Sequence, residues 1–354
     1  MSLEKLRKQI DHLDEKLIKL LNERISVALE IGNTKKEQGG EIYVPAREKA
    51  VFDRVSELNG NGPLPADAVR AIYREIMSAA LALESDLKIA YLGPPATFTH
   101  QAARQKFGAS VDYHPVGSIA DVFSAVENGT ADYGVVPIEN STEGAVTHTF
   151  DQFTSTSLKI CAEVYLPISL CLLASVPKEK ITRICSKQEA IGQCRKWLSS
   201  NLSGIEFDAV NSTALAAEMA AESDCAAVAS QLAAELYGLE IVAENIQDVS
   251  GNTTRFLVIG RTSSEATGGD KTSLYFGIKD KPGALHDVLA ALKTNDINMS
   301  KIESRPSKDK AWEYVFFVDI EGHADDSNVK AALEELNEHC AVLNVLGSYP
   351  KAEA

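Results

Sequence analysis

An apolar stripe near the start of the chain is interrupted by positively charged side chains. Its apolar members recur every three or four residues, as is typical of a helix packed against helices: Ile10, Leu13, Leu17, Leu20, Leu21, Val27, Ala28 and Ile31. Arg24 and Lys35 continue this stripe, where an unpaired cation would be costly. In a helix these two side chains would point about 20° apart and lie about 16 Å apart along the axis. Such a pair could close around a small dianion; a structural ion pair of Arg24 with an acidic residue is the alternative.

Arg7 continues the same stripe toward the N-terminus. It would lie about 25 Å from Arg24 along a helix, too far to share a site within one chain. If Arg7 binds the same ligand, it must do so in the site of a partner chain. This geometry predicts an antiparallel helical dimer.

Polar residues follow or precede apolar strands in the middle of the chain. Val135–Val136 ends a predicted strand, and Glu139-Asn140-Ser141-Thr142 follows at its carboxyl end, where sites in open α/β sheets form. An ordinary capped turn is the alternative. Thr254-Arg255 precedes the apolar run 256–259. Arg255 could be a fork for a carboxylate, or part of a surface or structural ion pair.

The elements that must position these residues change in type along the chain. Three helices are predicted first, then alternating strands and helices typical of an α/β domain with a largely parallel sheet. A Gly/Ser-rich stretch, 262–270, is a plausible linker. Beyond it the pattern predicts a βαββαβ, ferredoxin-like unit. The helices are expected at 2–38, about 45–58 and about 66–84, and the last unit at 273–279, 283–294, 297–304, 312–320, 325–338 and 341–348.

Composition narrows the classes of partner. A net charge of −15 argues against nucleic acid and anionic membrane. The six cysteines stand singly, so we expect reduced, buried thiols. The seven histidines lack metal-ligand spacing, and no apolar run reaches membrane-spanning length. We therefore expect a cytoplasmic protein without a metal or other cofactor.

The helical segment resembles the all-helical chorismate mutases. The matching pieces are Leu6-Arg7, Asn22-Glu23-Arg24, Lys35, Pro45-Ala46-Arg47-Glu48 and Glu84. The resemblance implies that Arg24 and a partner chain's Arg7 clamp carboxylates, Lys35 faces the ether oxygen, and Glu48 binds a hydroxyl. Val44, Ala80 and Glu84 depart from the family pattern, and an ionised Glu84 would repel charge on the ether oxygen. The implied mutase site is Arg7, Arg24, Lys35, Arg47, Glu48 and Glu84, with Arg24, Lys35 and Glu84 catalytic.

Residues 88–261 resemble prephenate dehydratases. Three motifs carry this resemblance: 93–99 (GPPATFT), 135–141 (VVPIENS) and 252–256 (NTTRF). It implies two lobes like those of type II periplasmic binding proteins, with crossings near 163–168 and 244–249. Thr254 would stand at the leaving hydroxyl, and Glu139 is a possible proton source. Ala96 and Glu189 depart from the pattern. The implied substrate site is Thr97, Thr99, Asn140, Ser141, Thr142, Ser186, Thr254, Arg255 and Phe256.

Residues 272–349 resemble the ACT regulatory domain. The motifs are Asp280-Lys-Pro-Gly-Ala-Leu285 and Lys301-Ile-Glu-Ser-Arg-Pro306. Gly283 would let the backbone of a ligand approach a helix N-terminus, which favours a carboxylate. The two motifs are similar to the phenylalanine-binding form, and a bare dimerisation domain is the alternative. The implied effector site is Gly283, Ala284, Leu285, Asn298, Glu303, Ser304, Arg305 and Pro306.

Together the resemblances imply a multidomain bifunctional enzyme. We expect a helical mutase domain at 1–86, a two-lobed α/β dehydratase domain at 87–262 and an α+β ACT domain at 272–350. The expected ligands are chorismate, prephenate and L-phenylalanine, and the expected assembly is a homodimer or larger homo-oligomer. Three alternatives stay open: a phenylalanine sensor without catalysis, a dehydratase whose helical module only dimerises, and arogenate as the dehydratase substrate.

Overall fold

The computed structural model describes residues 2–202, 204–279, 281–306 and 314–352. The chain forms two compact units. The first contains residues 1–88 and 106–112, and the second contains residues 89–105 and 113–354.

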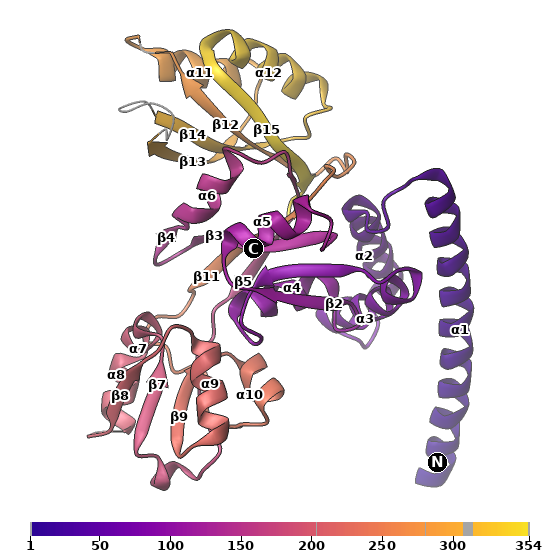
Figure 1. Ribbon diagram of the computed structural model, residues 1–354. Coiled ribbons are helices and arrows are strands. Elements are labelled where there is room, and N and C mark those ends of the chain that lie inside the picture. The colour runs from indigo at the N-terminus through magenta and orange to yellow at the C-terminus, as the bar shows by residue number, and fades with distance from the viewer. Residues whose placement is uncertain (1, 203, 280, 307–313, 353–354) are drawn as a thin grey trace. The chain divides into compact units, whose positions relative to one another are not determined.

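The first unit contains three helices, as the sequence predicts (Figure 1). The Ser2 hydroxyl accepts a hydrogen bond from the Lys5 backbone at the start of the first helix. Gly39 ends this helix with φ of 70°, a left-handed conformation that glycine adopts without strain. Pro45 begins the second helix, where its fixed φ and missing N–H are tolerated. The helices are α1 (Leu3–Gln38), α2 (Pro45–Asn59) and α3 (Ala66–Glu84).

The first sheet of the second unit is mixed rather than largely parallel. Its order is β2-β1-β3-β11-β5, with β4 paired to β3. β1 and β3 are parallel, but β11 runs antiparallel to both β3 and β5. The expectation of a largely parallel sheet is therefore wrong here, because β11 enters the sheet from the opposite end after the chain returns from the second lobe. The elements are β1 (Lys88–Leu92), α4 (Phe98–Phe107), β2 (Asp112–Val116), α5 (Ile119–Glu127), β3 (Tyr133–Asn140), β4 (Gly144–Ala145), α6 (Thr147–Phe153), β5 (Lys159–Pro167) and β11 (Thr253–Gly260).

A five-stranded sheet with the order β10-β6-β9-β7-β8 forms the second lobe. The chain enters it after Pro167, slightly later than predicted, and leaves it between Ala243 and Thr253, which includes the predicted return. Here too parallel and antiparallel pairs are mixed. The elements are β6 (Cys171–Ala174), β7 (Arg183–Ser186), α7 (Gln188–Gln193), α8 (Arg195–Asn201), β8 (Glu206–Ala209), α9 (Thr213–Glu222), β9 (Cys225–Ala229), α10 (Gln231–Tyr237) and β10 (Glu240–Ala243).

The last part of the chain has the predicted βαββαβ order, and its antiparallel sheet runs β13-β14-β12-β15. β13 therefore lies at an edge. Asp280 of the first effector motif and the predicted start of a strand at residues 312–313 lie outside the described residues. The elements are β12 (Asp270–Ile278), α11 (Ala284–Thr294), β13 (Met299–Pro306), β14 (Tyr314–Glu321), α12 (Ser327–His339) and β15 (Cys340–Pro350).

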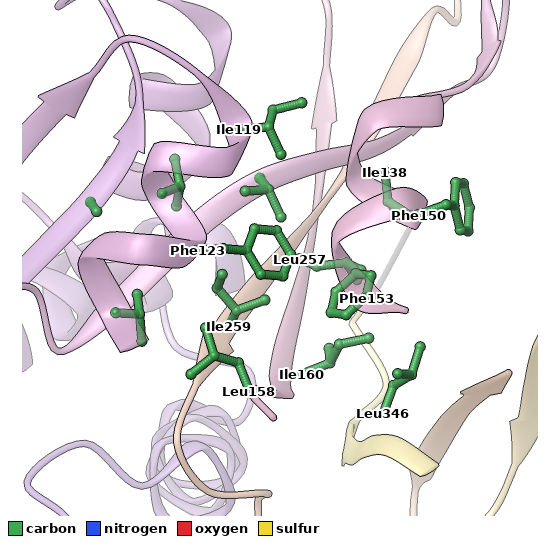
Figure 2. Close-up of a cluster of buried hydrophobic side chains, with 14 of the residues drawn as sticks. Ile119, Phe123, Ile138, Phe150, Phe153, Leu158, Ile160, Leu257, Ile259 and Leu346 are labelled. Atoms are coloured by element: carbon green, nitrogen blue, oxygen red, sulfur yellow. The ribbon is translucent and has the colours of Figure 1, made fainter. Parts of the chain in front are cut away.

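The first sheet of the second unit, which contains β3 and β11, and the C-terminal sheet share one hydrophobic core (Figure 2). Phe123 and Phe153 meet edge to face at 5.2 Å between ring centroids, and Phe150 contacts Phe317 of β14 at 4.8 Å. The predicted linker is held against β15, because the Ser264 backbone N–H donates a hydrogen bond to the Ser348 carbonyl. All six cysteines are free and buried, as predicted.

Candidate active sites and effector site

A pocket with about 740 Å³ of empty space lies among the three helices of the first unit. Five of the six residues predicted for the mutase site line it; Arg7 does not. Because α1 carries Arg24 and Lys35 on one stripe, both reach the pocket as the helical spacing predicts. The lining is Arg24, Ala28, Ile31, Lys35, Ile42, Tyr43, Val44, Arg47, Glu48, Val51, Met77, Ala80, Leu81 and Glu84.

Glu48 is held by two neighbours in this pocket. Its Oε2 accepts a hydrogen bond from the Tyr43 hydroxyl at 2.9 Å. The same oxygen pairs with Lys106 Nζ at 2.5 Å, and both side chains of the pair are largely buried. Lys106 lies on α4, 58 positions further along the chain, so helical periodicity could not have placed it here. It was missed by the sequence reasoning.

Glu84 lies where α3 approaches α1. A side chain at Gly32 would collide with the Glu84 side chain, since an added Cβ would meet its Cγ at 2.8 Å. Burial raises the pKa of Glu84, and the opposing charges of Lys35 and Lys36 only partly offset it. A carboxyl with a raised pKa is protonated, and so able to donate a hydrogen bond, at a higher pH than usual.

Arg7 is exposed on α1, far from this pocket. The apolar residues around it are also exposed: the exposed fractions of Leu6, Ile10, Leu13 and Leu17 lie between 42% and 57%. A stripe of this kind in a single chain is the face that a second helix would cover.

A larger cleft, with about 1620 Å³ of empty space, lies between the two lobes of the second unit. Of the predicted dehydratase residues, Thr97, Thr99, Asn140 and Thr254 line it. The lining also contains residues from the second lobe that lie outside the predicted substrate site. Among the described residues of the lining, the polar and charged ones are Thr97, Thr99, Asn140, Glu143, Lys187, Glu189, Gln193, Asn211, Ser212, Thr213, Glu218, Asn252 and Thr254.

Asn140 is the centre of a hydrogen-bond network at the floor of this cleft. Its Oδ1 accepts from the backbone N–H groups of Thr142 and Glu143 at 2.9 and 3.0 Å. Its Nδ2 therefore points the other way and donates to Thr254 Oγ1 at 2.7 Å and to Asn252 Oδ1 at 2.8 Å. Because Thr254 Oγ1 accepts this bond, its own hydroxyl proton remains available to a ligand in the cleft.

Ser141 and Thr142 support this network without lining the cleft, whereas Ser186 and Phe256 lie apart from it. Ser141 Oγ accepts from the Thr253 backbone at 3.0 Å, and the Thr142 hydroxyl donates to Asn140 Oδ1 at 2.6 Å. Ser186 is fully buried and donates to the Val228 carbonyl at 2.6 Å. Phe256 is buried in β11.

Glu139 and Arg255 lie on the other face of the sheet. Successive side chains of a strand point to opposite faces, and Thr254 pairs with Asn140 while Arg255 pairs with Glu139. Arg255 is buried and bonded to Glu163, Asp319 and Tyr349, and Glu139 pairs with Lys301. The structure therefore does not bring the expected carboxylate fork and the expected proton source into the cleft. Of the two roles expected for Arg255, the structure shows the structural ion pair.

The turn at residues 93–99 keeps the geometry that a glycine would give. Ala96 has φ of 68°, in the left-handed region that costs most residues energy. Its backbone N–H donates to His100 Nδ1 at 3.1 Å, and its carbonyl accepts from Ser230 at 3.1 Å. Burial lowers the pKa of His100 to about 4, so the ring is neutral and Nδ1 can accept. These bonds offset the strain of an alanine here.

Lys187 is the single cation in the described lining of the cleft. Its Nζ lies 3.3 Å from the Glu189 carboxylate. The pKa of Glu189 is lowered, mainly because this carboxylate accepts a hydrogen bond from the Glu189 backbone N–H. Glu189 is therefore ionised at neutral pH. A dianionic ligand would meet Lys187 on the second lobe and the hydroxyl and amide groups of Thr254 and Asn140 on the first.

The predicted effector residues do not converge in one pocket of the single chain. Gly283 caps α11 with φ of 78° and open space where a Cβ would be, and Ala284 is buried. Asn298 lines a separate pocket beside Ile297 and Met299. Glu303, Ser304, Arg305 and Pro306 lie on the edge strand β13, and Arg305 turns toward Asp151 at 3.9 Å. Leu285 packs against the core of this domain.

Two features are absent from the described residues. No helix there is long and apolar enough to cross a membrane. Within the same residues, no group of three His, Cys, Asp or Glu side chains could hold a metal ion.

Comparison with known proteins matches most of the chain to three families in succession. The chorismate mutase type II family matches residues 6–85, the prephenate dehydratase family residues 89–264 and the ACT domain residues 272–338. A protein of Aquifex aeolicus named bifunctional chorismate mutase/prephenate dehydratase is 51% identical over 99% of this chain and 98% of its own length.

Two solved structures resemble about three quarters of the chain. A prephenate dehydratase of Arthrobacter aurescens in complex with L-Phe has a TM-score of 0.70 and 36% identity, covering 75% of this chain and 90% of its own. A second, described as GqqA, a novel type of quorum quenching acylase, has a TM-score of 0.68 and 32% identity, covering 75% of this chain and 98% of its own. Since one fold carries two named activities, the residues of the cleft and not the fold must decide the chemistry.

Proposed function

We infer the roles of individual residues from one premise: the chain belongs to the family of bifunctional chorismate mutase/prephenate dehydratases. The first reaction rearranges chorismate to prephenate. The second removes carbon dioxide and the ring hydroxyl from prephenate, and the products are phenylpyruvate, carbon dioxide and water. Both serve the synthesis of phenylalanine.

For the mutase reaction we propose that the helical pocket folds chorismate by its carboxylates. The rearrangement is concerted, so the protein has only to orient the substrate and to stabilise charge on the breaking ether bond. Arg24 and Arg7 of the partner subunit bind the carboxylates, and Arg47 adds positive charge at the pocket wall. Lys35 and Glu84 face the ether oxygen, to which Glu84 donates only when it is protonated. Glu48, oriented by Tyr43 and Lys106, accepts from a substrate hydroxyl. The exposed stripe of α1 supports this homodimer.

For the dehydratase reaction we propose that Thr254 hydrogen-bonds to the leaving hydroxyl. The observation that carries this proposal is the 2.7 Å bond from Asn140 to Thr254, which leaves the threonine proton free in the cleft. As the ring carboxylate departs as carbon dioxide, its bonding pair completes the aromatic ring, and the hydroxyl leaves as water after taking up a proton. Lys187 binds a substrate carboxylate, and Thr97, Thr99, Ser141 and Thr142 shape the turns around the site. No step requires a cofactor.

For regulation we propose that L-phenylalanine inhibits the dehydratase by binding the C-terminal domain between two copies of the chain. The edge strand β13 has an unpaired side on which a second copy can add, and the L-Phe complex of the Arthrobacter relative supports the choice of ligand. We also propose the domain limits 1–86, 87–262 and 272–350, and a cytoplasmic location suited to biosynthesis.

The test is a coupled assay with purified protein. We expect phenylpyruvate from either chorismate or prephenate, and we expect L-phenylalanine to inhibit its release. If prephenate is consumed but chorismate is not, the helical module only dimerises. If arogenate is turned over faster than prephenate, the substrate assignment changes while the site remains.

A further inference from the structure

The two central strands of the catalytic sheet present different residues to their two faces. Thr254 and Asn140 are paired on the cleft face, and their neighbours Arg255 and Glu139 are paired on the opposite face. On each strand, the residue on the cleft face and the residue on the opposite face are consecutive and share one peptide bond. Any force that moves Arg255 or Glu139 therefore acts directly on the backbone that carries Thr254 or Asn140.

Arg255 is tied to three strands by its guanidinium group. Its Nε donates to Glu163 Oε2 of β5 at 2.8 Å, its Nη1 to Asp319 Oδ2 of β14 at 2.5 Å, and its Nη2 to the Tyr349 hydroxyl of β15 at 3.0 Å. Lys271 completes the cluster by pairing with Glu163 at 2.9 Å. The two cations and two carboxylates balance in charge.

The cluster is buried, so the distances between its charged groups can change little. The side chains of Arg255, Glu163, Lys271 and Asp319 are 6%, 0%, 9% and 8% exposed. Buried charges of this kind tolerate little displacement, because water does not replace a lost partner. The N–H donors of a guanidinium group point in fixed directions, so the hydrogen bonds of Arg255 also constrain the position of β11.

Glu139 is tied to the same domain by a second ion pair. Lys301 Nζ of β13 lies 2.6 Å from Glu139 Oε2, and the Lys301 side chain is 13% exposed. A small pocket is lined in part by Arg255, Lys301 and Asp319, so residues of both ion pairs border one space. Lys301 is also the first residue of the second effector motif.

We propose that Asp319 and Lys301 are positioning residues for the dehydratase reaction: from the C-terminal domain they fix Arg255 and Glu139, and thereby hold the Asn140–Thr254 bond in its catalytic geometry. The inference rests on the proposed role of Thr254. It also gives the effector a route to the cleft, since a ligand that shifts β13 or β14 changes these two ion pairs. Coupling between two binding sites is reciprocal. A variant that breaks this route must therefore also weaken the effect of bound substrate on the affinity for the effector.

The experiment uses the full chain and prephenate as substrate. Asp319→Asn keeps the shape of the side chain and removes the charge that faces Arg255. We expect the dehydratase kcat to fall about tenfold, because small displacements of a reacting group cost up to about a hundredfold. KM for prephenate should stay within about twofold, since the cleft lining is unchanged. Lys301→Met should lower kcat less and raise the L-phenylalanine concentration needed for half-inhibition.

Three controls make the result decisive. Asp325→Asn is the matched control: it makes the same change at an exposed aspartate of the C-terminal domain that pairs with Lys330, so it should change neither kcat nor inhibition. The mutase rate of each variant reports the amount of folded enzyme. Should Asp319→Asn fail to fold, Tyr349→Phe removes a single hydroxyl from the cluster and should lower the dehydratase kcat by a smaller factor.

Each outcome decides a different question. Wild-type kcat in Asp319→Asn or Tyr349→Phe would overturn the positioning role, as would an equal loss in Asp325→Asn. Thr254→Ala is measured in parallel. If it retains full activity, the proposed active site is wrong; if it is inactive while Asp319→Asn is not, only the inference about the C-terminal domain fails.

Discussion

The helical pocket and the two-lobed cleft position their polar groups in opposite ways. In the pocket, Arg24 and Lys35 are held by the spacing of one helix, and Arg7 on the same helix cannot reach them. In the cleft, Asn140 and Thr254 come from strands 114 positions apart in sequence but 2.7 Å apart in space. The first arrangement is local, and in the proposed dimer Arg7 of the partner subunit completes it. The second depends on long-range contacts and closes within one chain.

This difference determines what each site depends on. In the proposed dimer, a site built on one exposed helix depends on the second copy that covers this helix. A site built across a sheet depends on the packing behind the sheet, and here the core behind it includes Phe317 and Leu346 of the C-terminal domain. The two activities should therefore respond to different perturbations, and the predictions below test this separation.

The largest effect is expected from removing an arginine of the helical pocket. Arg24→Ala and Arg7→Ala should each lower the mutase rate about a thousandfold, the upper range for one charge-stabilising group, and leave the dehydratase rate largely intact. After subunit exchange, a mixture of the two variants should regain part of the mutase activity, because one site of each mixed dimer has both arginines. Absence of rescue in a confirmed mixed dimer would contradict the shared site.

A smaller but still large effect is expected at Thr254. Thr254→Ala removes the hydroxyl that Asn140 orients and should lower the dehydratase kcat about a hundredfold. Thr254→Ser keeps the hydroxyl and is the matched control. Mutase activity should be unchanged in both variants. Normal phenylpyruvate formation from prephenate by Thr254→Ala would show that another group serves the leaving hydroxyl.

The sequence predicted the local parts of this molecule better than the long-range parts. The three helices and the βαββαβ unit follow from periodicity within short segments, and the structure confirms them. The direction of β11 does not follow from such patterns, because it depends on where the chain returns from the second lobe. Placing Glu139 and Arg255 away from the cleft required the register between β3 and β11, which sequence alone does not supply.

The same limit applies to charged partners. Lys106 and Asp319 look like ordinary surface charges in the sequence, yet one contacts Glu48 and the other Arg255. The stretch 262–270 has the composition of a flexible linker, but Asp270 accepts bonds from Thr267 and Gly268 and is buried. The composition of this segment is that of a free linker. Hydrogen bonds within the segment and to Ser348 nevertheless hold it in place.

A moderate, pH-dependent effect is expected at Glu84. Burial raises the pKa of this carboxyl, and only the protonated form donates a hydrogen bond to the ether oxygen. The mutase rate should therefore rise as pH falls toward that pKa. Glu84→Gln donates at every pH, so it should flatten the profile and raise the rate at neutral pH by up to about tenfold, less than a full oxyanion donor supplies. A rate independent of pH between about 5 and 8 in both proteins would refute the role.

The smallest effect is expected at Lys106, and it tests whether the helical pocket is as local as it looks. Lys106 lies within the range that matches the dehydratase family, 89–264, yet it belongs to the compact unit of the helices. Its ammonium group lies 2.5 Å from Glu48, and the two side chains are 20% and 12% exposed. Without this cation, the Tyr43 hydroxyl would still hold one oxygen of Glu48, so the carboxylate loses orientation rather than its place.

Lys106→Met should therefore raise KM for chorismate a few-fold, the size expected for one partly exposed ion pair, with kcat nearly unchanged because Arg24 and Lys35 remain. Lys49→Met is the control, since Lys49 pairs with Asp53 on the outside of the same helix that carries Glu48. Mutase kinetics at low and high salt check the cause: added salt should reduce the difference between wild type and Lys106→Met, because it screens the lost charge. If KM for chorismate is the same in wild type and Lys106→Met at low salt, the mutase site depends on its own helices alone, and the contrast with the cleft becomes sharper.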